Sequence, residues 1–295
     1  MEDTRTHAPV DLGTGSPLTR IVVLMMLDEH DDHGVAVGAR LAERWAFPIK
    51  LVSLDPSADD AVTMSAGQAV EAARGTLAAA HPALDVSDEI IAAAHDPAVA
   101  LAASLATSDL VVVSGAATAG ERTESLAQTL AHEWGGPIMM IGPHMGLDTI
   151  DGDVVVGVDG SALSERGLPV AIGLAAAFGA QLWVVQVVPS SVTDHVERLK
   201  ARGERVSETS YIHDLVEGLG PSVRWEIIHG DEPAAALVDC ADRHNASALV
   251  MATHGRSALP RPVFGSVCME AVRRATRPVM VIRPTKVSPE LALGS

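Results

Sequence analysis

The sequence has few aromatic residues: four Trp, three Phe and one Tyr among 295 residues. A core without many large rings must be filled by smaller side chains, and Ala and Val take that role in a chain that is 47% hydrophobic. Such a core suits helices packed closely on a parallel sheet. Cysteine is also scarce. Cys240 and Cys268 stand apart in helix-like stretches without C-x-x-C spacing, which predicts neither a zinc site nor a redox pair and favours a reducing cytosol.

Positive charge is in short supply as well, with 21 Lys and Arg against 38 Asp and Glu and a formal net charge of −17. A chain this acidic repels phosphate backbones, which excludes sequence-independent binding to nucleic acid. No apolar run approaches the roughly 20 residues that a membrane helix needs, and the N-terminus has no apolar segment of the secretory kind. We therefore expect a cytoplasmic protein with no membrane partner, whose acidic surface serves solubility.

One structural pattern occurs twice along the chain. Short β-branched runs alternate with longer Ala-rich helical runs, which is typical of βαβ units around a parallel sheet. In each half, the expected third strand is followed by an acidic turn and a proline, Pro97 or Pro233, which suits the first turn of a helix. The fold class predicted is α/β, with two doubly wound five-stranded parallel-sheet domains. The matching strands are 21–27 with 154–158, 49–56 with 182–189, 89–91 with 226–228, 110–113 with 248–251, and 137–141 with 278–282.

Polar residues and glycines gather at the strand ends of the second half. Doubly wound sheets bind ligands beyond the carboxyl ends of their strands, at the point where the strand order reverses. Asp159-Gly-Ser161 follows the first strand of this half, and Thr253-His-Gly255 follows the fourth. A loop then leads to Gly265-Ser266, where an amphipathic helix is expected to begin. The second half therefore has a candidate binding crevice.

The residue types in this loop suit a phosphate ligand. Glycine lets the backbone approach an anion closely and adopt a positive φ, and a helix N-terminus adds partial positive charge. Gly255 at the strand end and Gly265 at the helix start offer these features. Ser266 is a good helix N-cap, and Arg256 offers a charged fork to phosphate. Asp159 could accept hydrogen bonds from a ribose or a base edge.

Each of these features also has a plainer interpretation. Glycines at strand ends and helix caps are common without a ligand, and the pattern is neither the Walker loop nor the dinucleotide fingerprint. Asp159 can cap the turn after its own strand, and His254 is interpreted as an orienting loop residue rather than a base. His30 and His33 lie in an Asp-rich turn that is interpreted as a solvated loop rather than a metal site. The sequence thus predicts no catalytic residues and no metal ligands.

Taken together, these residues resemble the universal stress protein family, as a tandem of two domains. The family's motif is Gly-x2-Gly-x9-Gly-Ser/Thr, and here it reads Ala252-x2-Gly255-x9-Gly265-Ser266 with the nine-residue spacing intact. The strings Thr253–Ser257, Val154–Ser161 and Gly230–Pro233 are similar to the family's strings at the corresponding places. The resemblance covers residues 153–283 closely and residues 20–142 in outline.

The resemblance implies that ATP, with or without Mg²⁺, binds in the second half alone. Asp159 and Val187 would contact the adenosine, Val187 through its backbone. This sequence departs from the family pattern at Ala252, which replaces the first glycine, and at Pro260 and Pro262, which stiffen the loop. The residues assigned to the phosphate side of the site are Ala252, His254, Gly255, Arg256, Gly265, Ser266 and Val267.

The first half matches the second in its strands but not in its loop. Met26 falls near the position of Asp159, Ala116 or Ala117 replaces Gly255, and Glu124-Ser125 replaces Gly265-Ser266. We therefore expect no ATP in this half. The resemblance also implies that the two last strands pair antiparallel in a pseudo-twofold arrangement, which covers sheet edges that would otherwise be exposed.

These interpretations lead to an ATP-binding regulatory protein of the general stress response, which at most hydrolyses ATP slowly. The alternative is a nucleotide-free scaffold that acts through protein contacts. A third reading, an enzyme of a related nucleotide-binding α/β family, lacks a catalytic constellation. Expected partners are ATP and unnamed regulatory proteins, and a homodimer is left open. The expected organisation is an N-terminal tail (1–19), a degenerate domain (20–142), a linker (143–152), an ATP-type domain (153–284) and a C-terminal tail (285–295).

Overall fold

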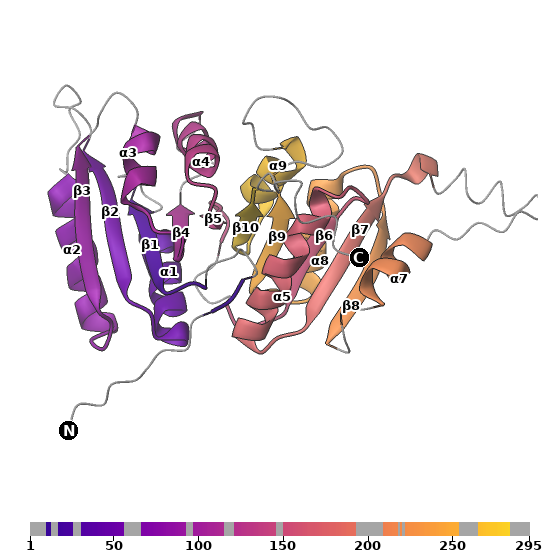
Figure 1. Cartoon of the computed structure of the whole chain (residues 1–295), viewed down its shortest axis with the longest axis horizontal. Helices are drawn as coiled ribbons and strands as arrows, with labels where there is room; N and C mark the ends of the chain where they lie inside the picture. The colour runs from indigo at the N-terminus through magenta and orange to yellow at the C-terminus, as the bar shows by residue number, and fades with distance from the viewer. Residues whose placement is uncertain are drawn as a thin grey trace, which may run out of the picture.

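A computed structural model gives the architecture of the chain (Figure 1). It describes residues 10–12, 17–25, 31–55, 66–92, 97–114, 121–145, 150–192, 209–217, 219, 222–253 and 265–283. Strands and helices alternate through both halves, as the sequence predicts. The strands are β1 Arg20–Met25, β2 Ile49–Asp55, β3 Val86–Ala92, β4 Asp109–Ser114, β5 Ile138–Ile141, β6 Val154–Val158, β7 Leu182–Val188, β8 Val223–His229, β9 Ala248–Ala252 and β10 Val279–Ile282. The helices are α1 Asp31–Trp45, α2 Ala66–Ala80, α3 Pro97–Ser104, α4 Glu121–Glu133, the 3-10 turn η1 Ser164–Arg166, α5 Gly167–Phe178, α7 Ser210–Val216, α8 Pro233–Arg243 and α9 Ser266–Arg274.

All ten strands form one sheet in the order β3-β2-β1-β4-β5-β10-β9-β6-β7-β8. Neighbouring strands are parallel within each half, and only β5 and β10 pair antiparallel. The predicted fold class is therefore confirmed, and the strand ends differ from the predicted ones by a few residues. In each half the first strand is flanked by the second on one side and the fourth on the other, so the strand order reverses beside β1 and beside β6.

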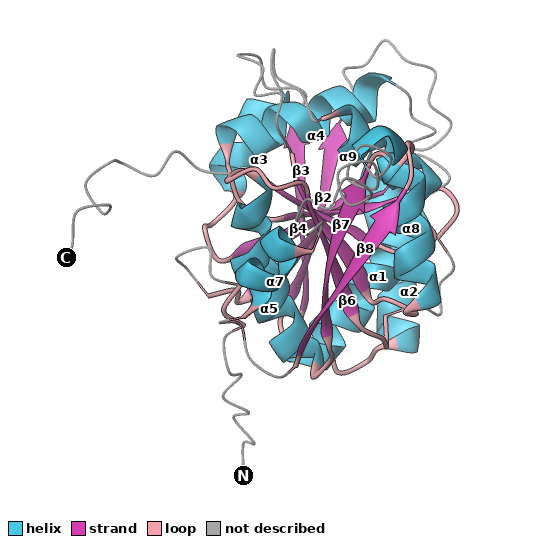
Figure 2. Cartoon of the chain, turned by 90° about the vertical axis from the view of Figure 1, so that its right-hand side faces the viewer, coloured by secondary structure: helices cyan, strands magenta, loops and turns pink. Residues whose placement is uncertain are grey.

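Helices cover both faces of the sheet, and each face has its own hydrophobic core (Figure 2). Alternate residues of β1 show the division, since Ile21 and Val23 lie in one core and Val22 and Leu24 in the other. Helices α1, α2, α5 and α7 contribute to the first core, and α3, α4, α8 and α9 to the second. Both cores extend across the two halves. The chain is thus a three-layer α/β/α structure with a continuous central sheet.

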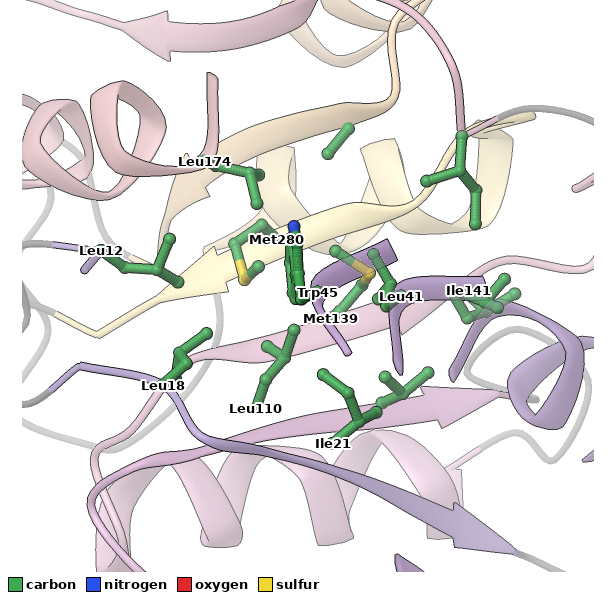
Figure 3. Close-up of a cluster of buried hydrophobic side chains, with 14 of the residues drawn as sticks. Leu12, Leu18, Ile21, Leu41, Trp45, Leu110, Met139, Ile141, Leu174 and Met280 are labelled. Carbon is green, nitrogen blue, oxygen red and sulfur yellow. The ribbon is translucent and has the colours of Figure 1, made fainter. Parts of the chain in front are cut away.

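The two halves meet along β5 and β10 about a local pseudo-twofold axis. Met280 pairs with Met139, and each is the second residue of its strand. Both methionines are fully buried, and Figure 3 shows them in the cluster that also contains Trp45 of α1 and Leu174 of α5. Because equivalent positions face each other, the contact has the self-complementary form of a twofold dimer interface. The antiparallel pairing of the last strands is confirmed.

Contacts between helices of the two halves reinforce this seam. The guanidinium of Arg44 donates to Phe178 O at 2.7 Å and lies over the Phe178 ring, 5.1 Å from its centroid. Trp45 packs against the same ring at 5.5 Å between centroids. Arg283, just after β10, donates to the carbonyl oxygens of Ala131 and His132 near the end of α4, where a cation is favoured by the exposed carbonyl groups. Side chains therefore join the halves on both sides of the sheet.

One segment of the expected N-terminal tail belongs to the core instead. Val10 and Leu18 exchange backbone hydrogen bonds, and the side chains of Leu12 and Leu18 are fully buried. Gly173 of α5 faces this segment so closely that an added Cβ would lie 2.2 Å from Asp11 O. The expectation of a flexible tail over residues 1–19 was therefore wrong for residues 10–12 and 17–19, because Leu12 and Leu18 bury their side chains in the hydrophobic core.

Two further details bear on function. We predicted a solvated turn around His30 and His33. The prediction is wrong for His33, because α1 begins at Asp31 and His33 lies within this helix. His30 lies outside the described residues. Across the described residues, no helix combines the length and the apolar character that crossing a bilayer requires.

Candidate functional site

The predicted site lies at the reversal of strand order in the second half. β6 and β9 are adjacent and parallel, with Val156 opposite Val250, so their carboxyl ends meet at one edge of the sheet. Asp159 follows β6 directly, and Thr253 follows β9. The structure therefore brings together the two strand ends that the sequence singled out.

The turn after β6 is held by side-chain hydrogen bonds. Asp159 Oδ1 accepts from Ser161 N at 2.9 Å, and Ser164 Oγ accepts from Asp159 N at 3.1 Å. Ser164 is buried, and its hydroxyl donates to Ser161 O at 2.8 Å. Gly160 has a φ of +81°, a conformation that favours glycine. The plainer interpretation of Asp159 as a turn cap is thus confirmed, and the same contacts fix the direction of its carboxylate.

Val187 borders this turn through its backbone. The last pair between β6 and β7 is Val158 with Gln186, and β7 continues to Val188. The backbone of Val187 therefore passes the carboxyl end of β6, while its side chain packs in the core on the α8 side. This placement fits the backbone contact to adenosine that the family resemblance implies.

The motif loop has its two ends joined. Gly265 N donates to Thr253 O at 2.5 Å, and Thr253 N donates to Ile282 O at 2.9 Å. The loop is thereby anchored to β9 and β10 at its base. His254, Gly255 and Arg256 lie outside the described residues. The described part of the motif consists of Ala252, Gly265, Ser266 and Val267.

Gly265 is the N-cap of α9, a position that we predicted for Ser266. Met269 N donates to Gly265 O at 3.1 Å, which makes Gly265 the residue before the first helical turn. Ser266 is instead the first helical residue, and its exposed side chain lies beside the exposed Val267. The prediction failed because a close backbone contact decides the cap. A Cβ on Gly265 would lie 2.9 Å from Thr253 O.

The conformation of Gly265 also corrects one reason given for glycine in this motif. Its φ is −57° and its ψ is 144°, which any residue can adopt. Glycine is needed here for the close approach to Thr253 O and not for a positive φ. The free N–H groups of a first helical turn point along the helix axis, toward an incoming anion. Those of α9 therefore point outward at the same edge of the sheet where the Asp159 turn lies.

Ala252, the departure from the family motif, is an ordinary strand residue. It is the last residue of β9 and pairs with Ile282 of β10. The non-glycine residues with positive φ in the described part of the chain are Ala46 and Asn245. Since Ala252 is not among them, its methyl group causes no backbone strain at this position.

The first half carries different groups at the equivalent positions. Strand register makes Ile21 equivalent to Val154 and Leu110 equivalent to Ala248, so Ser114 takes the place of Ala252. Ser114 is fully buried, and its Oγ lies 3.5 Å from Oδ1 of the buried Asp31. A carboxylate thus occupies the end of the strands in this half. Met26, Ala116 and Ala117 lie outside the described residues, as do the side chains of Glu124 and Ser125.

Sequence reasoning missed one polar residue near the turn of Asp159. Tyr211 of α7 donates its hydroxyl to Glu165 Oε1 of η1 at 2.9 Å. Burial, followed by the hydrogen bond to Glu165 and the charge of Asp159, raises the pKa of Tyr211, so this hydroxyl stays protonated. No sequence motif marks Tyr211, because it lies 46 residues from Glu165 and meets it only in the folded chain.

Comparison with known proteins bears on the origin of this arrangement. Residues 152–283 match the model of the universal stress protein family. These residues form a universal stress protein domain. A universal stress protein of Methanocaldococcus jannaschii is 28% identical over 143 residues, which span 45% of this chain and 82% of the relative.

Solved universal stress proteins share the fold over both halves. A universal stress protein from Archaeoglobus fulgidus DSM 4304 superposes with a TM-score of 0.60 at 14% identity, covering 90% of this chain and 96% of that one. A putative universal stress protein from Pseudomonas aeruginosa UCBPP-PA14 gives a TM-score of 0.55 at 16% identity, covering 90% and 94%. At these identities the likeness shows the fold alone, and it extends the universal stress protein architecture to the first half.

Proposed function

We propose that this universal stress protein binds ATP in its C-terminal half and acts as a regulatory protein of the stress response. The observation that carries the proposal is the convergence of the Asp159 turn, the Val187 backbone and the N-terminus of α9 at one edge of the sheet. Adenosine would lie against Asp159 and Val187. The phosphates would lie at the start of α9, between Gly265, Ser266 and Val267, and under the loop that contains His254, Gly255 and Arg256. Mg²⁺ would accompany the phosphates without a dedicated set of protein ligands.

The shape of the loop base supports this assignment. Gly265 N is held by Thr253 O, so the two residues that flank the segment 254–264 lie together where α9 begins. A closed loop in front of a helix N-terminus can wrap an anion with backbone N–H groups. The proposed role is binding rather than catalysis, so any ATP hydrolysis is expected to be slow.

The first half is proposed to pair rather than to bind nucleotide. Its buried Asp31 places a carboxylate where the second half has Ser164, which precedes the equivalent helix. The Ser164 hydroxyl holds the Asp159 turn, so the turn proposed to contact adenosine loses this support where Asp31 replaces the serine. The first half instead covers the edge of β10 and completes both cores.

A nucleotide-free scaffold remains the second candidate. It is supported by the polar contact between Ser114 and Asp31, which lies at the strand ends of the first half. In that case, protein partners would bind equally well whether or not the loop that ends at Gly265 is altered.

The nucleotide content of the purified intact protein tests the proposal. The protein is denatured, the released small molecules are identified by mass spectrometry, and ATP, GTP and AMP are titrated by calorimetry with and without Mg²⁺. We expect one adenine nucleotide per chain and a preference for ATP over GTP. If no nucleotide is released and millimolar ATP gives no heat of binding, the ATP proposal is wrong and the scaffold is favoured.

Ala252→Gly, which restores the family's first glycine, should leave the affinity for ATP within about threefold, roughly 0.7 kcal/mol. The reason is that Ala252 already has the backbone conformation of a paired strand residue. The same change should lower the free energy of unfolding by about 0.5–1 kcal/mol, because glycine loses more conformational freedom in a strand. Calorimetry and urea denaturation measure the two effects. A gain in affinity of about tenfold would show instead that the methyl group obstructs the nucleotide.

A further inference from the structure

Three side chains of different metal-binding types converge away from the sheet edge. Glu226 lies in the middle of β8, Cys240 in α8, and His244 at the C-cap of the same helix. One ligand atom from each lies within 4.8 Å of the other two. Cys240 and His244 are four residues apart, so both face β8 from one side of the helix. The cluster shares no residue with the proposed nucleotide site.

The two distances from Glu226 to the other ligand atoms are close to those of a tetrahedral coordination sphere. Glu226 Oε2 lies 3.6 Å from Cys240 Sγ and 3.2 Å from His244 Nε2. Zinc bonds to sulfur, nitrogen and oxygen are about 2.0–2.3 Å, which places tetrahedral ligands about 3.3–3.7 Å apart. We propose that Glu226, Cys240 and His244 form a binding site for a divalent cation of the zinc type, with water as the fourth ligand. The cation would replace the hydrogen bonds that now join the three groups.

The surroundings hold two of the three ligands in place. Arg243 donates to Glu226 Oε1 at 2.6 Å, which leaves Oε2 directed at Cys240 and His244. The ring of His244 stacks on Trp183 with 3.7 Å between centroids, and Trp183 Nε1 donates to Asp153 Oδ2 at 2.9 Å. Outer contacts of this kind orient metal ligands and strengthen binding.

Charge and access also suit a zinc-type cation. Sulfur and imidazole nitrogen favour zinc over magnesium or calcium, which prefer oxygen ligands. Thiolate and carboxylate together neutralise a divalent charge, and Arg243 keeps its bond to the other carboxylate oxygen. Cys240 is fully buried, whereas the side chains of Glu226 and His244 are 31% and 19% exposed. A cation would therefore enter between Glu226 and His244 and leave room for one water.

Cation binding changes the protonation of Cys240. Without a cation, the Cys240 thiol donates its hydrogen to Glu226 Oε2. On binding, the sulfur forms a bond to the cation and its proton passes to solvent. The affinity is consequently expected to fall in acidic buffer, where the released proton competes with the cation.

Metal titration of the intact protein tests the site. After chelator treatment and buffer exchange, Zn²⁺ is titrated by calorimetry, and Co²⁺ is titrated by absorption, which reports tetrahedral geometry and a thiolate ligand. We expect one equivalent of either metal and a thiolate-to-cobalt band. Cys240→Ser should remove that band and weaken Zn²⁺ binding by more than about 100-fold, beyond the scale of an outer-contact change. His244→Gln should weaken binding to a similar degree.

Two variants serve as controls. Cys268→Ser changes the other buried cysteine, which lies in α9, and should leave the titration unchanged. His213→Gln removes a histidine from the exposed cluster of His213, Asp214 and Glu217, and should also leave it unchanged. The proposal is overturned if Zn²⁺ does not bind, if Cys240→Ser binds as the unmodified chain does, or if His213→Gln abolishes binding. If Cys240→Ser does not fold, the partly exposed His244 still decides the outcome through His244→Gln.

Discussion

Gly265→Asp is expected to weaken ATP binding by about 100-fold or more, roughly 2.7 kcal/mol. The new carboxylate would lie at the N-cap of α9, where the phosphates are proposed to bind. Two negative groups forced together in a binding site cost several kcal/mol. The Cβ that the substitution adds would also press on Thr253 O, 2.9 Å away, and shift the base of the loop.

Gly265→Asn separates these two effects, since asparagine has the same shape without the charge. We expect it to bind ATP more weakly than the unmodified chain but at least about tenfold more tightly than Gly265→Asp. Gly75→Asp is the matched control, because a Cβ at Gly75 in α2 meets nothing within 4 Å. It should bind ATP normally by calorimetry. Equal affinities for Gly265→Asp and Gly265→Asn would show that no phosphate lies near this position.

Met280→Asp is expected to cost about 4 kcal/mol or more of folding free energy, because a carboxylate at a fully buried position has no partner to replace water. Met280 faces Met139 at the pseudo-twofold axis, so the charge would lie in the pairing of β5 with β10. Folded domains are stable by only about 5–15 kcal/mol, and the variant should therefore unfold at much lower urea concentration. Circular dichroism during urea denaturation measures the shift.

The pseudo-twofold relation adds a sharper test of the seam. Met139→Ala and Met280→Ala should each cost about 2–5 kcal/mol and should cost similar amounts, because the two side chains are equivalent and equally buried. Val99→Asp is the control: Val99 is 46% exposed in the first turn of α3, where an acidic residue is favoured, and its effect should stay within about 0.5 kcal/mol. A Met280→Asp protein as stable as the unmodified chain would contradict the strand pairing.

Much of the fold could be predicted because its strands are short, apolar and separated by helical runs. The ten-stranded order follows from two doubly wound halves once β5 and β10 are paired, and that pairing came from the family resemblance. The burial of Leu12 and Leu18 was missed, since isolated leucines near a terminus carry no periodic signal. The α5 surface that faces Leu12 lies far along the sequence, and only the folded chain brings the two together.

The candidate sites show the same division between local and distant signals. The spacing from Gly255 to Gly265 is local, so the helix that begins after it could be predicted. The N-cap at Gly265 could not, because its reason is the distance to Thr253 O across the loop base. The cluster of Glu226, Cys240 and His244 was also beyond the sequence, because β8 supplies one ligand and α8 the other two.

The covalent link between the halves has a consequence for binding measurements. Two separate domains paired through their last strands would come apart on dilution, whereas β5 and β10 belong to one chain and stay paired at any protein concentration. A symmetric pair would also carry two equal sites that could influence each other. The first half bears Asp31 and Ser114 at its strand ends, and the nucleotide site is proposed for the second half alone. On that proposal, the nucleotide titration should follow a simple hyperbola with no cooperativity.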